Sequence, residues 1–349
     1  MDSNHTPRLL PLHFMLTSIR PILWTLLPLL YTTNVNATVS TRISLPPPER
    51  HEDSGWTLSN YQGIWTDGRP CRAARAVYPA TEADIRDSVS EAVRHGLKMK
   101  VATSVGYSTS KISCPDGDEG LIISLRDYVP QPVFVNSTDM TATVDAAMQL
   151  RDFVRELAGH GFTLPHTPLW DGVSVGGAIA TGSHGSGFFM RGSSVSEYVV
   201  GARVVVPAPP EDGYARVLDI GSSSDPHEKA LLEAVKMSLG VLGVLSKVTF
   251  SVMPMFKRSL TVRMSVDDEL ESEILRFSKA HDFASLFWVP SAGQVLYKEE
   301  DAVSMDSEGD GTNKFPLLLP MKVSDIKAMR DHRMFFLSTF ESCDEFGHG

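Results

Sequence analysis

The stretch 176–187, Gly-Gly-Ala-Ile-Ala-Thr-Gly-Ser-His-Gly-Ser-Gly, is the feature that most limits how this chain can fold. Bare backbone amides and hydroxyl groups follow one another here over a short path, which suits the cradling of a pyrophosphate. The dinucleotide fingerprint is absent, because no Gly-x-Gly-x-x-Gly opens a helix after a strand with an acidic residue about 20 positions later. On physical grounds, a glycine-rich surface loop explains the stretch as well as a phosphate cradle does.

Two further segments offer ligands a similar surface. A polar loop, Thr-Ser-Val-Gly-Tyr-Ser at 103–108, follows a strand expected at 98–102. Ligands of α/β folds commonly bind at the carboxyl edge of strands. The segment 240–245, Gly-Val-Leu-Gly-Val-Leu, lets backbone pack closely before another strand. Taken singly, the loop at 103–108 is also explained as an ordinary turn.

Hydrophobic periodicity divides the chain between residues 81 and 252 into alternating helices and strands. Helical spacing of apolar residues, with Thr81 and Asp225 as caps, predicts helices at 81–96, 149–161 and 225–237. Apolar and β-branched runs predict strands at 98–102, 121–125, 141–145, 198–206 and 244–252. The fold class is therefore α+β with mixed strands, and no internal repeat is visible.

The composition changes after Met253-Pro254, where a new strand–helix–strand unit is expected at 260–266, 268–280 and 286–289. After about residue 303 the periodic signal weakens into an acidic, turn-like stretch. We therefore expect residue 256 to open a second domain that is cut short. In such an unfinished sheet the apolar strand 286–289 would lack a partner and would favour aggregation.

The N-terminus has the pattern of a secretory signal. Arg8 and Arg20 precede a leucine-rich run at 21–31, and Val35-Asn36-Ala37 supplies small residues at the cleavage spacing. The run is too short for a spanning helix, although an uncleaved anchor is the alternative reading. We expect entry into the secretory pathway, with the extracellular space, the cell wall or the vacuole as destination. The sequon at Asn136 agrees with this route.

The cysteines and the charge narrow the classes of partner. In an oxidising compartment Cys71 and Cys114 are expected to form a disulfide, which leaves Cys343 over. No Cys-x-x-Cys spacing is present, so neither a zinc site nor an iron–sulfur site is expected. A formal net charge of −10 argues against a nucleic-acid partner, because phosphate binding needs a basic face.

Several motifs occur together in an order typical of one family. Pro-Ala-Thr-Glu-Ala-Asp-Ile at 79–85, the loop 103–108, the stretch 175–187 and Leu-Gly-Val-Leu-Gly-Val at 239–244 follow one another. This series resembles the FAD-binding domain of the vanillyl-alcohol oxidase and p-cresol methylhydroxylase superfamily. Within that superfamily it is similar to the plant L-gulonolactone oxidase branch of the aldonolactone oxidases. The resemblance runs from about residue 56 to about residue 303 and includes Phe-Trp-Val-Pro at 287–290.

The resemblance implies a two-subdomain FAD-binding domain at 66–255 and the start of a lactone-oxidase substrate domain at 256–318. A signal peptide at 1–37 and a lead-in at 38–65 precede them, and a divergent tail at 319–349 follows. The residues that the family's motifs place against FAD are Thr103, Ser104, Val105, Gly106, Tyr107, Ser108, Pro168, Gly176, Gly177, Thr181, Gly182, His184, Gly185, Ser186, Gly243 and Val244.

Three of these residues carry particular implications. Tyr107 stands where many relatives have the histidine that attaches FAD covalently, so the flavin is expected to be non-covalent. Pro168 lies in the segment that resembles the one crossing the flavin, where a small residue admits oxygen; a proline that only shapes the loop is the alternative. His184, among glycines, more often packs backbone or contacts the cofactor than acts as a base.

The family's reaction is the oxidation of an aldono-1,4-lactone, L-gulono- or L-galactono-1,4-lactone, at C2 to ascorbate or an analogue. Oxygen or another acceptor takes the electrons. The Glu-x-Arg pair and the late His-Trp-Gly segment of relatives are not found, so no catalytic acid or base is named and weak or no activity is expected. The alternatives are an FAD-binding product without catalysis and a berberine-bridge-type flavoprotein. Association with a membrane stays open.

Overall fold

A computed structural model describes residues 49–52, 55–58, 71–103, 110–115, 119–168, 170–221, 225–290 and 293–309. The expected signal peptide, the residues 104–108 of the polar loop, Cys343 and the tail after residue 309 lie outside this part of the chain. Within it, no helix combines the length and the apolarity that crossing a bilayer requires.

A small parallel sheet leads into the polar loop. Its strands β4 (Arg75–Val77), β6 (Leu121–Ser124) and β5 (Met99–Ala102) lie in that order. Helix α2 (Glu82–Arg94) connects β4 to β5 along the chain and buries Ile85 and Val89. Thr81 caps α2 by accepting from the Asp84 amide, and the Asp84 carboxylate accepts from the Thr81 amide. This confirms the helix and both strands expected from periodicity.

A second sheet is antiparallel and was not predicted. It contains β1 (Glu49–Glu52), β2 (Gly55–Leu58) and β3 (Cys71–Ala73). Cys71 at the start of β3 is bonded to Cys114, with their Cα atoms 5.6 Å apart, so the expected disulfide is confirmed. Cys114 directly follows the 3-10 turn η2 (Ser110–Ser113), and the bond therefore ties the chain beyond the polar loop to β3.

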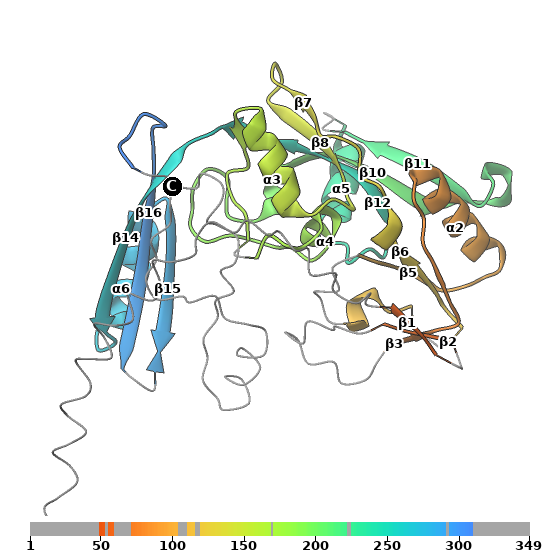
Figure 1. Ribbon diagram of the computed structural model, residues 1–349, viewed down its shortest axis with the longest axis horizontal. Coiled ribbons are helices and arrows are strands. Elements are labelled where there is room, and N and C mark those ends of the chain that lie inside the picture. Colours follow the sequence, from red (N-terminus) through yellow and green to blue (C-terminus); the bar gives the residue numbers. More distant parts are fainter. Residues whose placement is uncertain are drawn as a thin grey trace, which may run out of the picture. The chain divides into compact units, whose positions relative to one another are not determined.

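The largest sheet has five antiparallel strands in the order β11 (Ala215–Ile220), β10 (Val199–Pro207), β12 (Val244–Ser251), β8 (Thr141–Asp145) and β7 (Phe134–Asn136) (Figure 1). Three helices share one hydrophobic core with this sheet: α3 (Leu150–Gly159), α4 (Val175–Ala180) and α5 (Pro226–Val235). Helix α2 packs on β10 and β12 through a separate core, because Val205 and Val244 join Ile85 and Val89 there. The α2 helix thus links the parallel sheet to the five-stranded antiparallel sheet.

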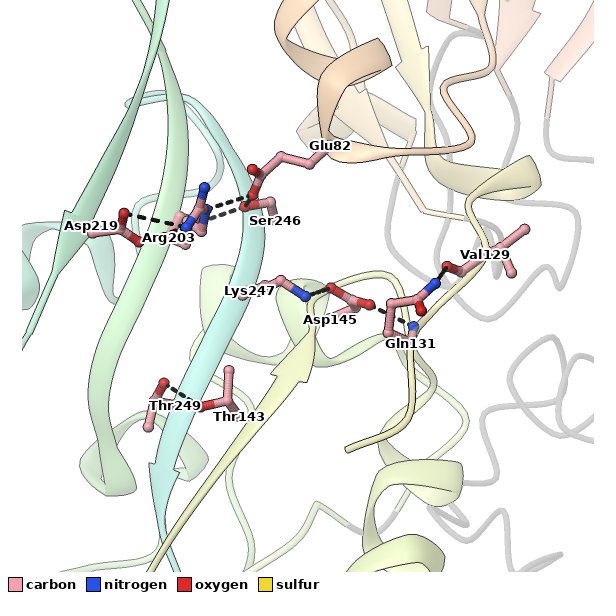
Figure 2. A network of polar contacts seen from close by, with 10 residues as sticks. All are labelled: Glu82, Val129, Gln131, Thr143, Asp145, Arg203, Asp219, Ser246, Lys247 and Thr249. Atoms are coloured by element: carbon pink, nitrogen blue, oxygen red, sulfur yellow. Dashed lines mark hydrogen bonds and ion pairs between the residues drawn. The ribbon is translucent and has the colours of Figure 1, made fainter. Parts of the chain in front are cut away.

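A polar network reinforces this link (Figure 2). The Glu82 carboxylate, in the first turn of α2, accepts from Arg203 Nε at 2.8 Å and from Ser246 Oγ at 2.6 Å. Burial alone would raise the pKa of Glu82, but the hydrogen bonds from Ser246 and Arg203 outweigh it and hold the pKa below the ordinary value. Beside them, Lys247 Nζ donates to Asp145 Oδ1 at 2.6 Å.

A fourth sheet begins at Lys257. Its strands β14 (Lys257–Val266), β16 (Gln294–Val303) and β15 (Phe283–Val289) lie in that order, and helix α6 (Leu270–Ala280) packs Phe277 against Tyr297 of β16 (Figure 1). The expectation that 286–289 lacks a partner is wrong, because β15 pairs with β16 along its whole length. Hydrophobic periodicity did not predict β16 because four charged residues stand at 298–301. These charges are paired in the structure, where Lys298 Nζ lies 3.1 Å from Glu300 Oε1.

The remaining elements are short. Strands β9 (Phe162–Thr163) and β13 (Met253–Pro254) form a two-stranded sheet. Three further 3-10 turns are η3 (Leu125–Asp127), η4 (Val195–Tyr198) and η5 (Pro210–Asp212). Strand β6 ends one residue before the limit expected at 125, and β10 begins one residue after the start expected at 198, because Leu125 and Tyr198 belong to η3 and η4.

Candidate functional site

Three segments far apart in the sequence meet beside α4. Thr103 follows β5, and a Cβ built on Gly177 of α4 would lie 3.7 Å from Thr103 Cγ2. The turn 237–240 is bonded to the end of the same helix, since the amides of Met237 and Leu239 donate to the carbonyls of Ile179 and Ala180 at 3.1 and 3.0 Å. The described parts of all three predicted cofactor segments are therefore neighbours.

Gly176 and Gly177 present bare backbone for different reasons. The Gly176 amide donates to Ala146 O at 2.8 Å, and a Cβ on Gly176 would lie 3.0 Å from the Ala146 Cβ. Gly176 is thus required by packing against the end of β8. The Gly177 amide donates to Ser174 Oγ, the N-cap of α4, at 3.1 Å. A Cβ on Gly177 would enter the space between Ser174 and Thr103, so glycine keeps this space open.

The rest of the glycine-rich run first bonds back onto the end of α4 and then packs onto other parts of the chain. Thr181 Oγ1 donates to Gly177 O at 2.8 Å, and Gly182 has φ +67° beside the Met237 side chain. His184 is exposed, and its Nδ1 lies 2.9 Å from Gly185 O, which suits a backbone-bonding role rather than a base. Ser186 is exposed as well.

Gly185 brings the run to the segment that contains Pro168. A Cβ on Gly185 would lie 2.8 Å from Thr167 O and 3.2 Å from His166 Nδ1. Pro168 itself is half-buried. The expected flavin-crossing segment and the glycine-rich run therefore lie side by side. The sequence alone did not indicate this contact.

Gly243 and Val244 hold the third segment against β10. Gly243 has φ +152°, and a Cβ there would collide with Val205 O, so no other residue fits without a backbone shift. Val244 is buried. These two residues fix the start of β12, and the exposed part of the segment is the preceding turn.

That preceding turn is strained and carries a lysine contact that the sequence did not reveal. Met237 and Leu239 have φ values of 55° and 52°, a region that costs non-glycine residues free energy and that clusters at functional sites. Lys100 Nζ, on β5, donates to Leu239 O at 2.6 Å. Burial lowers the pKa of Lys100. In the sequence, the only sign of this contact is a lysine between Met99 and Val101 in a predicted strand.

His166 is a second residue that sequence reasoning did not single out. It is 1% exposed, its Nε2 lies 3.0 Å from Phe189 O, and its ring centroid is 5.0 Å from that of Phe283 on β15. Burial lowers the pKa of His166, and the nearby Arg258 adds to this. His166 therefore packs the segment before Pro168 against strand β15 as a neutral ring.

Comparison with known proteins places these segments in a family context. Residues 73–208 match the family described as FAD binding domain. The chain is 40% identical over 279 residues to L-gulonolactone oxidase 2 of Arabidopsis thaliana, a match that covers 79% of this chain and 46% of that relative. It is 27% identical over 239 residues to an L-gulono-1,4-lactone dehydrogenase of Mycobacterium tuberculosis, covering 66% and 50%. The chain spans about half the length of the curated relatives it matches.

Solved structures agree at the level of fold. Cholesterol oxidase from Brevibacterium sterolicum superposes with a TM-score of 0.60 at 18% identity, covering 79% of this chain and 54% of that one. An alkyldihydroxyacetonephosphate synthase superposes with a TM-score of 0.54 at 13% identity, covering 66% and 48%. At such identities the likeness concerns the α+β fold alone.

Proposed function

We propose that the chain serves the FAD-dependent oxidation of an aldono-1,4-lactone, because residues 73–208 match an FAD binding domain and the chain is 40% identical to an L-gulonolactone oxidase. The proposed substrate is L-gulono- or L-galactono-1,4-lactone, oxidised at C2, and the proposed product is ascorbate or an analogue. Oxygen is the proposed electron acceptor. The observation that carries the proposal is the meeting of three predicted cofactor segments beside α4 in a chain with these relatives.

The described residues fit a flavin dinucleotide. Thr103 and Gly177 would lie beside the diphosphate, because the two residues are neighbours and Gly177 adds no side chain next to Thr103. The turn before Gly243 would lie along the cofactor, and its apolar side chains, including Leu239 at 46% exposure, would be covered by it. Bound FAD supplies the hydride acceptor, while the protein supplies orientation and polarity.

The segment at Pro168 bears on the choice of acceptor. His166 and Thr167, the two residues before Pro168, lie against the glycine-rich run and its continuation at Phe189. A small, rigid residue at this point would leave oxygen a path to the flavin, which supports oxidase rather than dehydrogenase behaviour. We assign no catalytic acid or base.

A secretory location is part of the same proposal. The disulfide between Cys71 and Cys114 supports it, because such bonds persist in oxidising compartments. Fractionation of cells that express the full chain with a C-terminal tag is the direct check. Recovery of the tag only from the cytosol, with both thiols free, would refute the location without touching the enzymatic proposal.

The test of function is a flavin spectrum together with lactone-dependent oxygen uptake. The purified chain is assayed beside a full-length relative, with L-gulono- and L-galactono-1,4-lactone as substrates. A flavin spectrum with oxygen uptake supports lactone oxidation. A flavin spectrum without uptake supports the second candidate, FAD binding without turnover, which rests on the match of residues 73–208 to an FAD binding domain. Absence of bound flavin under all loading conditions refutes both.

A further inference from the structure

Lys100 carries a half-buried charge that no described carboxylate neutralises. Its ammonium donates to Leu239 O at 2.6 Å, and this carbonyl is its only described partner. An ammonium group has three donors, so two remain for another acceptor. Two other partly buried lysines of the described chain have counter-charges, since Lys247 pairs with Asp145 and Lys298 with Glu300. Lys257 resembles Lys100 instead, because its ammonium donates to a carbonyl, Ser307 O, at 2.6 Å.

An ammonium in this position is costly until an anion joins it. Burial disfavours the charged form, which is why the pKa of Lys100 is lowered. The chain as a whole is acidic, with a net charge of −10, yet burial is the sole cause of the lowered pKa of Lys100 and no described carboxylate contributes to it. A bound anion would supply the missing counter-charge and would be held by charge-assisted hydrogen bonds.

The ammonium contacts one of the three cofactor segments, and the strand that carries it leads into a second. Strand β5 ends at Ala102, and the next residue, Thr103, lies beside Gly177. The carbonyl that Lys100 contacts belongs to Leu239, whose amide is bonded to the end of α4. A Cβ on Gly240 would lie 3.3 Å from the Val101 side chain, so the turn and β5 are in close contact on the other side as well.

We propose that Lys100 is a cofactor-positioning residue that holds the strained turn 237–240 and presents its positive charge to the diphosphate of FAD. The inference rests on the proposed FAD binding and adds a residue that the glycine-rich segments do not include. A role in holding FAD would explain why a lysine, rather than an apolar residue, occupies this position of β5. Its carbonyl partner, Leu239 O, lies 139 residues further along the sequence.

The test compares ligands that do and do not carry phosphate. Lys100→Met removes the charge and keeps the apolar stem, whereas Lys100→Arg keeps the charge. Lys229→Met, an exposed position on α5, is the matched control for loss of one positive charge. Dissociation constants of FAD, ADP and riboflavin are measured by fluorescence at several salt concentrations, and thermal melting of each variant without ligand checks the fold.

We expect Lys100→Met to weaken binding of FAD and ADP about 10- to 100-fold, the range of a charge-assisted hydrogen bond. Riboflavin binding should change less than about threefold, Lys100→Arg should retain most of the affinity, and Lys229→Met should match the unmodified chain. Unchanged FAD affinity in Lys100→Met would overturn the proposal. Equal losses for FAD and riboflavin would overturn the diphosphate contact and leave only a turn anchor. Failure of the unmodified chain to bind FAD would instead refute the proposed function, on which this inference depends.

Discussion

Lys247 and Asp145 face each other directly across strands β12 and β8, and their side chains join at 2.6 Å (Figure 2). The Asp145 side chain is fully buried, and its second oxygen, Oδ2, accepts a hydrogen bond from the backbone N–H of Gln131 at 2.6 Å. The residue after Asp145 carries the carbonyl that holds Gly176. One buried carboxylate therefore fixes both the pairing of β12 with β8 and the first glycine of the cofactor run.

Asp145→Asn should lower the free energy of unfolding by about 2 to 3 kcal/mol, because it breaks a charge-assisted pair and leaves Lys247 without its partner. The partial exposure of Lys247 keeps the loss below that of a fully buried pair. Urea denaturation of the variant beside Asp87→Asn, an exposed carboxylate on α2, measures the difference. A loss no larger than that of the control would contradict the role given to Asp145.

His166 should make stability depend on pH between neutral and mildly acid conditions. Its folded pKa lies below the unfolded value of 6.5, so the unfolded chain takes up a proton first as the pH falls. Stability is therefore full above pH 6.5 and declines below it. Measured at pH 7.5 and pH 5, the stability advantage of the unmodified chain over His166→Gln should shrink. His160→Gln, at an exposed site, serves as the control. An advantage that grows toward acid would sink the idea.

Removal of the disulfide should cost about 4 kcal/mol by the chain-entropy model for a separation of 43 residues. Cys71→Ala with Cys114→Ala is the suitable variant, since Cys71 lies in an apolar core. FAD affinity should fall too, because Cys114 anchors the chain just beyond the polar loop. Denaturation and flavin titration of the double variant check both effects, and the reduced unmodified chain should behave alike. Unaltered stability would show that the core holds this region without the bond.

Bound FAD should be non-covalent. By resemblance to the superfamily, Tyr107 stands where many of its members have the histidine that attaches FAD covalently. Tyr107 lies outside the described part of the chain. After acid precipitation the yellow colour should stay in the supernatant. Colour that remains with the pellet would mean a covalent link to Tyr107 or another side chain.

Features that depend on a few consecutive residues could be predicted well. The capping box of Thr81 and Asp84 and the Asp225-Pro226 start of α5 are formed by neighbours in the chain, so the sequence alone specifies them. The runs that became β8 and β12 are recognisable because their buried alternation is local. The disulfide followed from the expected compartment and the small number of cysteines.

Features that depend on distant partners could not be predicted. The charged strand β16 looks like a loop until Arg263 and His281 are placed beside its carboxylates at 299 and 301. The site behaves likewise, since the glycine-rich run indicated bare backbone but not what surrounds it. The sequence by itself determined the α+β class, the capped helices and the segments available to a cofactor. Only the tertiary structure decided that Lys100 meets Leu239 and that His166 meets Phe283, because burial and pairing of such groups depend on neighbours that long-range packing alone brings together.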